Sequence, residues 1–204
     1  MMCDTMVKVY SKHDVFIGEF NGIYCTEELL NKGVPFSTIR RYVEKGDLIR
    51  IQHGIYVTKD CMDDEWVTLQ KRYRKGIFSG YTAMYLQNMS DQIPTEFYMT
   101  FPRGYNAKSF DECEYNVIPK FVIPRFYELG ITEVETPYGN KVRTYNRERT
   151  LCDIVRGEGI DRDVIKQAMR NYLRSDGVDI HRLSSYAEML HVKPKIHQLV
   201  EAMT

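Results

Sequence analysis

Residues 26–58 read TEELLNKGVPFSTIRRYVEKGDLIRIQHGIYVT, and this stretch decides the fold of the N-terminal part of the chain. Two short helical patterns are separated by Gly33 and Pro35, because glycine tolerates a positive φ at a helix end and proline prevents continuation of the helix. Two β-patterned segments then flank His53-Gly54, a dipeptide suited to a hairpin turn. The order helix, turn, helix, hairpin predicts a winged helix-turn-helix.

The boundaries and inward faces of these elements follow from residue type. We expect Thr26 and Ser37 to cap the two helices, since a hydroxyl oxygen accepts a free N–H group of the first turn. On the second helix, Ile39, Tyr42 and Val43 form the apolar stripe that packs inward. The hairpin strands carry apolar residues on both faces, so the sequence leaves open which face of the wing looks inward.

Basic residues gather around this module on a chain whose 28 basic and 28 acidic residues cancel. Residues 32–59 hold six basic and two acidic residues, a local charge of +4, and residues 71–75 add four basic residues without an acid. Net charge therefore says nothing about a polyanionic partner, whereas the local clustering suits phosphate binding. Exposed arginines also occur simply for solubility, and winged helices also serve as protein-interaction modules, so both alternatives stay open.

The second helix and the wing supply the predicted DNA contacts. Arginine can form two hydrogen bonds to a guanine edge in the major groove, while hydroxyl groups and lysines hold phosphates. Because one short helix reads only a few base pairs, we expect operator DNA with inverted half-sites, bound by a monomer or by a dimer assembled on the DNA. The predicted DNA-binding residues are Ser37, Thr38, Arg40, Arg41, Lys45, Arg50 and His53, with Lys71, Arg72, Arg74 and Lys75 extending the basic surface.

The rest of the chain predicts a second domain of mixed structure. A polar joint and a following helix place the boundary between about residues 60 and 76, and we assign residues 1–60 to the winged helix and 61–204 to the second domain. The fold class is therefore α+β, with a helical C-terminal end. We expect helices at residues 7–20, 64–75, 81–88, 146–155, 161–174, 179–190 and 194–203, and strands of the second domain at 77–79, 96–101, 117–126, 133–136 and 141–145.

Signals for catalysis or metal binding are weak. The sequence holds no GxGxxG, P-loop, HExxH or GxSxG motif. The five cysteines form no CxxC pair, and His181, His191 and His197 fall on no shared ligand face. We therefore expect no metal site and no cofactor.

Three further patterns are interpreted as structural. Glu133 and Glu135 alternate along one side of a strand and suit an exposed edge better than general acid/base catalysis. Arg149 and Asp153, four residues apart, suit the support of a helix. The aromatic residues of segment 96–101 could stack on bases but suit core packing better. The protein is therefore expected not to be an enzyme.

The N-terminal residues MMCDTMVKVYSKHD lack the apolar run of a signal peptide. No stretch of the sequence approaches the ~20 apolar residues that a membrane span needs. The widely spaced cysteines suit reduced thiols. We therefore expect a cytoplasmic protein without membrane contact.

Three segments carry a family resemblance. The run ELLNKGVPFSTIRRYVEKGDLIRIQHGIYV resembles the antitoxin-type N-terminal domain of the AbiEi abortive-infection family. That domain ends in a helix, a G-x-L-x-R step and an x-x-G-x-Y wing. Further along, IFSGYTAMYLQNMSDQIP and TYNRERTLCDIVR are similar to two C-terminal signatures of the family. The matching motif residues of the N-terminal run are Gly46, Leu48, Arg50, Gly54 and Tyr56.

The resemblance implies a two-domain transcriptional repressor and antitoxin. Such proteins are encoded beside a nucleotidyltransferase-like toxin, repress their own operon and counteract the toxin in phage defence, and stable contact with the toxin is not required. Two other classes stay open. One is a ligand-responsive winged-helix transcription factor without a toxin partner, and the other is an enzyme with a nuclease-like C-terminal domain.

Overall fold

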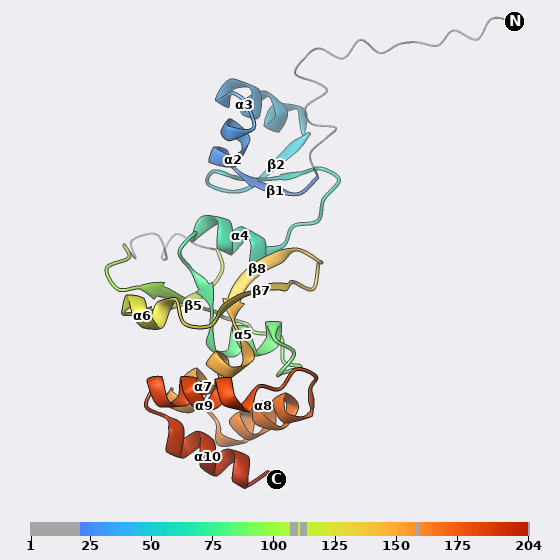
Figure 1. Cartoon of the computed structure of the whole chain (residues 1–204). Coiled ribbons are helices and arrows are strands. Elements are labelled where there is room, and N and C mark those ends of the chain that lie inside the picture. The colour runs from blue at the N-terminus through green and yellow to red at the C-terminus, as the bar shows by residue number, and fades with distance from the viewer. Residues whose placement is uncertain (1–20, 107–109, 111–113, 158–159, 204) are drawn as a thin grey trace, which may run out of the picture. The chain divides into compact units, whose positions relative to one another are not determined.

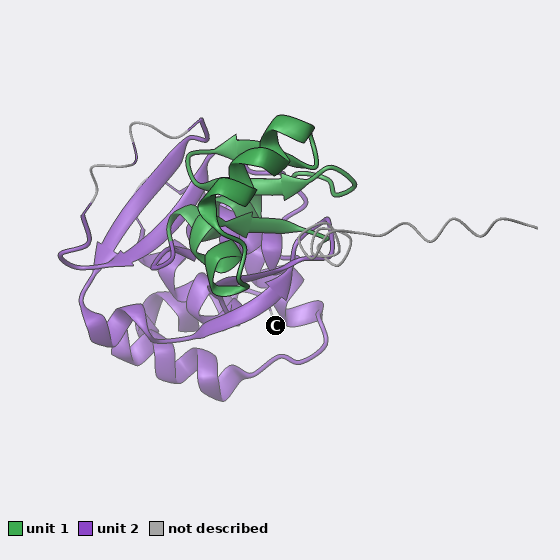
Figure 2. Ribbon diagram, turned by 90° about the horizontal axis from the view of Figure 1, so that it is seen from above, with its two compact units in different colours: residues 1–73 green, residues 74–204 purple. Residues whose placement is uncertain are grey.

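The computed structural model describes residues 21–106, 110, 114–157 and 160–203. The helix predicted at residues 7–20 lies outside the described residues. The chain divides into two compact units, residues 1–73 and 74–204, which Figure 2 distinguishes by colour. Both units contain helices and strands, which confirms the predicted α+β class.

Unit 1 contains a three-stranded antiparallel sheet with the strand order β1-β3-β2 (Figure 1). The predicted hairpin is formed by β2 and β3. Its turn residue Gly54 has a φ of +72°, a left-handed conformation that glycine adopts without strain. The elements of unit 1 are β1 (Ile23–Cys25), α2 (Thr26–Asn31), α3 (Phe36–Lys45), β2 (Leu48–Gln52), β3 (Ile55–Thr58) and α4 (Glu65–Arg72).

Both faces of this sheet are covered. On one face, Leu48 and Tyr56 pack in a cluster with Ile39 and Tyr42 of α3. On the other face, apolar residues of β1 and β3 pack with Val67 of α4. The sequence left the orientation of the wing open because the wing has apolar residues on both faces. One face packs with α2 and α3, and the other packs with α4.

The caps of the first two helices lie before the predicted ones, by one residue in α2 and by two residues in α3. Cys25 precedes α2, and its N–H group donates to Glu28 Oε2 at 2.8 Å. Thr26 is therefore the first helical residue and not the cap. The second helix begins before Ser37, because the carbonyl of Pro35 already accepts two N–H groups of its first turn at 2.9 and 3.0 Å.

The helix α4 belongs to unit 1. Asp64 caps it by accepting two N–H groups at 3.0 and 3.2 Å. Trp66 and Leu69 of this helix and Tyr73 at its end are buried. The division of the chain into units falls after Tyr73, within the predicted boundary region of about residues 60–76 but later than the residue 60 used for the domain assignment, and α4 packs on the sheet of unit 1. The functions assigned to the two domains stay predictions.

Unit 2 contains a five-stranded mixed sheet with the order β6-β5-β4-β8-β7. The pairs β5–β6 and β4–β8 are parallel, and the pairs β4–β5 and β7–β8 are antiparallel. In β5, Phe97, Met99 and Phe101 are buried, which confirms core packing of the aromatic segment. The strand predicted at 117–126 is shorter, because Pro124 begins a helix. These elements are β4 (Ile77–Phe78), β5 (Phe97–Pro102), β6 (Val117–Val122), α6 (Pro124–Tyr127), β7 (Ile131–Glu135) and β8 (Lys141–Tyr145).

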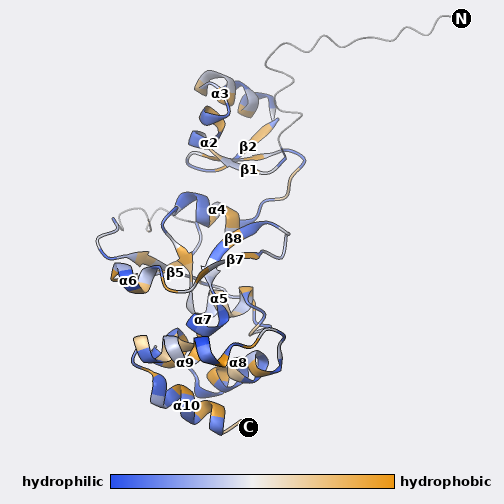
Figure 3. Ribbon diagram, viewed as in Figure 1, coloured by the Kyte–Doolittle hydropathy of each residue, from blue (hydrophilic) through white to orange (hydrophobic). Residues whose placement is uncertain are grey.

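The other helices of unit 2 pack around α7. Its residues Leu151, Cys152 and Ile154 are fully buried in a cluster with α5, α8, α9 and α10. Asn146 caps α7, and its side chain accepts the N–H of Arg149 at 3.0 Å. Figure 3 shows both apolar and polar residues on α8, α9 and α10, as expected of helices with one face on a core. These helices are α5 (Gly80–Leu86), α7 (Arg147–Arg156), α8 (Arg162–Arg174), α9 (Ile180–Met189) and α10 (Lys193–Glu201).

Candidate nucleic-acid interface

The outward face of α3 carries five of the eleven predicted DNA-binding residues. Ile39 and Tyr42 are buried in the unit 1 core and fix the rotation of the helix about its axis. Side chains on the opposite side of the helix are therefore accessible. The outward residues are Ser37, Arg40, Arg41 and Lys45, which are exposed, and Thr38, which is half-buried.

The two arginines of α3 make only local contacts in the described structure. The Nε of Arg40 lies 3.1 Å from Glu44 Oε1, and the two side chains are 78% and 62% exposed. The guanidinium of Arg41 lies 5.5 Å from the ring centroid of Tyr42. Exposed ion pairs of this kind contribute at most about 1 kcal/mol. Arg40 can therefore exchange Glu44 for a phosphate or a base edge at low cost.

The turn of the wing brings two further predicted residues together. The Nη2 of Arg50 lies 2.9 Å from His53 Nδ1, a contact in which a neutral imidazole accepts the hydrogen bond. Both side chains are exposed. The carbonyl of Gly54 accepts hydrogen bonds from the N–H and the hydroxyl of Thr26, at 2.8 and 3.2 Å. The tip of the wing is thereby fastened to the start of α2.

Lys71 and Arg72 have partners within unit 1 that the count of charges could not reveal. The Nζ of Lys71 lies 2.7 Å from both carboxylate oxygens of Glu28. Arg72 donates to the side-chain oxygen of Gln52 and to the hydroxyl of Tyr73, each at 3.2 Å. Both basic side chains are half-buried, so they contribute less free positive charge than the sequence indicated. Arg74 and Lys75 are exposed and belong to unit 2.

Comparison with known proteins finds a family match for the segment that contains α2, α3 and the hairpin. Residues 26–59 match the family of AbiEi antitoxin transcriptional regulators. The match confirms the family resemblance over these residues, which we call the AbiEi segment, and supports a role as an antitoxin and regulator. No curated protein matches the chain. Among solved structures, the crystal structure of the RV2827C protein from Mycobacterium tuberculosis aligns with 93% of this chain and 79% of its own, with 12% identity and a TM-score of 0.49.

Glu28 connects the AbiEi segment to α4. Burial raises the pKa of its carboxyl, whereas hydrogen bonds from Lys71 and from the N–H of Cys25 lower the pKa. The lowering is the larger effect, so the pKa lies below its ordinary value. The folded state therefore favours the ionised carboxylate. This preference stabilises unit 1 above the unfolded-state pKa and is lost as the pH falls through the lower folded-state pKa.

Replacing Glu28 by glutamine is expected to destabilise unit 1 at neutral pH, modestly because the carboxylate is 41% exposed. The difference from the wild type should shrink as the pH falls from about 7 to about 3, because the wild-type carboxyl becomes protonated as the pH passes through its lowered folded-state pKa. Urea unfolding followed by the fluorescence of the single tryptophan, Trp66, measures this difference. An equal difference at both pH values would contradict the assigned role of the carboxylate.

The residues considered for catalysis take structural positions. Glu133 and Glu135 are exposed on β7, at the edge of the sheet, opposite Arg143 and Lys141 of β8, which confirms the interpretation as edge residues.

Burial and the charge of Asp153 raise the pKa of the Cys152 thiol to about 12, so this thiol stays protonated at neutral pH. The described cysteines are Cys25, Cys61 and Cys152, and none of the three forms a disulfide.

His181, His191 and His197 are exposed. Within the part of the chain that the structure describes, no group of three or more histidine, cysteine or acidic side chains is placed to hold a metal ion. In the same described residues, no helix is both long and apolar enough to cross a membrane.

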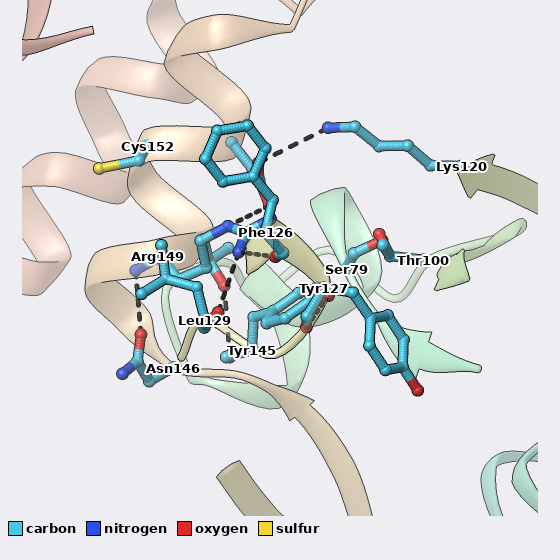
Figure 4. A network of polar contacts seen from close by, with 12 residues as sticks. Ser79, Thr100, Lys120, Phe126, Tyr127, Leu129, Tyr145, Asn146, Arg149 and Cys152 are labelled. Atoms are coloured by element: carbon cyan, nitrogen blue, oxygen red, sulfur yellow. Dashed lines mark hydrogen bonds and ion pairs between the residues drawn. The ribbon is translucent and has the colours of Figure 1, made fainter. Parts of the chain in front are cut away.

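Sequence reasoning missed one polar cluster, which lies in unit 2. Arg149 and Asp153 form the predicted pair along α7, with Nε and Oδ2 3.0 Å apart, but both side chains are buried. Lys120 of β6 reaches the same carboxylate, with Nζ 3.6 Å from Oδ1 (Figure 4). Lys120 is distant from α7 in sequence and lies on a strand. Only the four-residue spacing of Arg149 and Asp153 could therefore indicate the cluster from the sequence.

Proposed function

We propose that the chain is a DNA-binding antitoxin that represses its own toxin–antitoxin operon. The observation that carries this proposal is the family match of residues 26–59, the segment whose outward face presents Ser37, Arg40, Arg41 and Lys45. In this proposal unit 1 acts as a winged helix-turn-helix, with α3 as the recognition helix and the β2–β3 hairpin as the wing. The burial of Ile39 and Tyr42 supports it, because it turns the basic side of α3 away from the core.

The proposed contacts follow from the chemistry of these side chains. Arg40 and Arg41 reach base edges in the major groove, while Ser37 and Thr38 hold the helix start on the backbone. Lys45, together with Arg50 and His53 at the turn of the wing, binds phosphates. Two copies bind inverted half-sites, since one helix of this length contacts only a few base pairs.

The antitoxin role is assigned to unit 2. Its functional partner is a nucleotidyltransferase-like toxin of a phage-defence system, and neutralisation requires no stable contact between the two proteins. The chain itself acts in the cytoplasm without catalysing a reaction. The family match supports the general antitoxin and regulator role, and the nature of the toxin rests on the resemblance alone.

Replacing Arg40 and Arg41 by alanine is expected to weaken operator binding at least about tenfold, because two side chains that contact bases or phosphates are lost. A gel shift of the full chain with DNA from upstream of its own gene measures the affinity. The matched control replaces Lys193 and Lys195 of α10, which removes the same charge from unit 2. Unchanged affinity in the arginine variant, or an equal loss in the control, would contradict α3 as the reading helix.

A further inference from the structure

Unit 2 contains a cavity of about 330 Å³ beside the polar cluster of α7. Its walls are mostly apolar and aromatic, and they come from α5, β5, β6 and α7 and from the segment after α7. Tyr81 and Tyr98 contribute two rings whose centroids lie 5.6 Å apart at 59°. Ile118, Ile154 and Ile160 supply aliphatic walls. A cavity of this size and lining suits a single-ring organic molecule.

Two charged side chains also line this cavity, and one of them holds an unsatisfied oxygen. The Asp153 side chain is only 4% exposed, and its Oδ2 accepts a hydrogen bond from Arg149. Its Oδ1 is the one buried side-chain nitrogen or oxygen among the described residues that has no hydrogen-bond partner. Lys120 Nζ lies 3.6 Å away, which exceeds hydrogen-bond length. A buried acceptor without a donor is costly, so a ligand with an N–H or O–H group would be stabilised there.

The charge around this oxygen restricts the ligand further. Asp153 lies between two cations, Arg149 and Lys120, so the cluster carries a net charge of +1. The guanidinium of Arg149 is occupied, because it also donates to the carbonyls of Phe126 and Leu129. Lys120 is 44% exposed and lines the cavity, so its ammonium group is available to an anion. The ligand therefore needs an acidic group for Lys120 and a neutral donor for Asp153.

We propose that this cavity binds a small aromatic monocarboxylate that carries a hydrogen-bond donor next to its acid group. The carboxylate pairs with Lys120, the donor satisfies Asp153 Oδ1, and the ring lies among Tyr81, Tyr98 and the isoleucines. The donor and the acid must be adjacent on the ligand, since the two protein atoms they meet are only 3.6 Å apart. The site lies wholly within unit 2 and does not depend on DNA binding.

The probe is 2-aminobenzoate, titrated into the full chain by isothermal calorimetry. Its amine retains one N–H group for Asp153 after the other N–H has bonded its own carboxylate. We expect saturable binding with one site per chain and a dissociation constant below about 1 mM. Benzoate lacks the donor, and 2-aminobenzamide lacks the charge, so both should bind at least about fivefold more weakly, since each forfeits one hydrogen bond to a charged group.

Two variants distinguish this cavity from adventitious binding. Lys120→Gln removes the cation, and Ile118→Trp fills the space, so each should weaken 2-aminobenzoate at least about tenfold. Lys141→Gln removes an exposed lysine of β8 outside the cavity and should leave the affinity unchanged. Thermal unfolding of each variant establishes that it is folded, and Asp153 is left intact because it supports Arg149. Absence of saturable binding, or equal affinity in the wild type, Lys120→Gln and Ile118→Trp, would overturn the proposal.

Discussion

Replacing Arg149 by methionine is expected to destabilise unit 2 by about 3–5 kcal/mol, the cost of leaving a buried charge without its partner. Arg149 is 1% exposed and its Nε bonds Asp153 Oδ2. In the variant, the carboxylate of Asp153 would stay buried with only Lys120 nearby, at 3.6 Å. Methionine retains much of the apolar volume, so the predicted loss comes mainly from the polar contacts.

Arg149 also joins α7 to α6 and to the segment that follows α6. Its Nη1 donates to the carbonyls of Phe126 and Leu129, and its guanidinium lies 4.4 Å from the ring centroid of Tyr145. Lysine has a single ammonium group and cannot reproduce this fork of contacts. Arg149→Lys should therefore also destabilise unit 2, though less than Arg149→Met, because a cation is kept beside Asp153.

The measurement must separate the two units, because a single unfolding free energy is not defined for a chain with two compact units. Hydrogen–deuterium exchange of peptides from α7 reports on unit 2, while the fluorescence of Trp66 reports on unit 1. The double variant Arg149→Met/Asp153→Asn removes both charges and should recover at least about 1 kcal/mol relative to Arg149→Met. A loss below about 1 kcal/mol in Arg149→Met would contradict the structural role assigned to this residue.

The elements of unit 1 could be predicted from local signals. Gly33, Pro35 and Gly46 mark the ends of α2 and α3 through backbone properties that do not depend on the rest of the fold. The caps were wrong by one residue in α2 and by two residues in α3, since a helix start depends on which carbonyl accepts the first N–H groups. In α3 the carbonyl of Pro35 accepts two N–H groups of the first turn, and in α2 the carboxylate of Glu28 accepts the N–H of the cap residue Cys25.

Contacts between distant residues could not be predicted. A count of charges treats every lysine as free, yet Lys71 lies 43 residues from Glu28 in sequence and bonds its carboxylate. The same limit applies to unit 2, where the spacing of Arg149 and Asp153 predicted a helix pair but gave no sign of Lys120. The unsatisfied oxygen and the cavity depend on how β6 meets α7, which no local pattern encodes.

Two glycines show most clearly that local sequence does not reveal contacts between distant residues. Gly130 and Gly139 both lie in polar turns beside β7, and both have a positive φ, of 79° and 80°. Local sequence does not show which of the two positions tolerates a side chain. In the structure, a Cβ on Gly139 would meet nothing within 4 Å, whereas a Cβ on Gly130 would lie 2.8 Å from the Cβ of Arg149 and 3.0 Å from Asn146 Oδ1.

Replacing Gly130 by alanine is therefore expected to destabilise unit 2 by about 2–5 kcal/mol. The positive φ accounts for about 1–2 kcal/mol, and the forced displacement of Arg149 or of the α7 cap for a further 1–3 kcal/mol. Gly139→Ala is the matched control, because it incurs the same backbone strain without the collision. Exchange of α7 peptides should show the larger loss for Gly130→Ala.

The comparison of these two variants also tests how closely the α7 network is packed. The N–H of Asn146 donates to the carbonyl of Gly130 at 2.8 Å, while its side chain caps α7, so a shift at Gly130 must move the start of the helix. If Arg149 is what the new methyl group meets, Gly130→Ala should cost less in an Arg149→Met background than in the wild type. Equal losses for Gly130→Ala and Gly139→Ala would mean that Arg149 can move aside. The contacts of Arg149 would then not be fixed, and its expected large contribution to the stability of unit 2 would be contradicted.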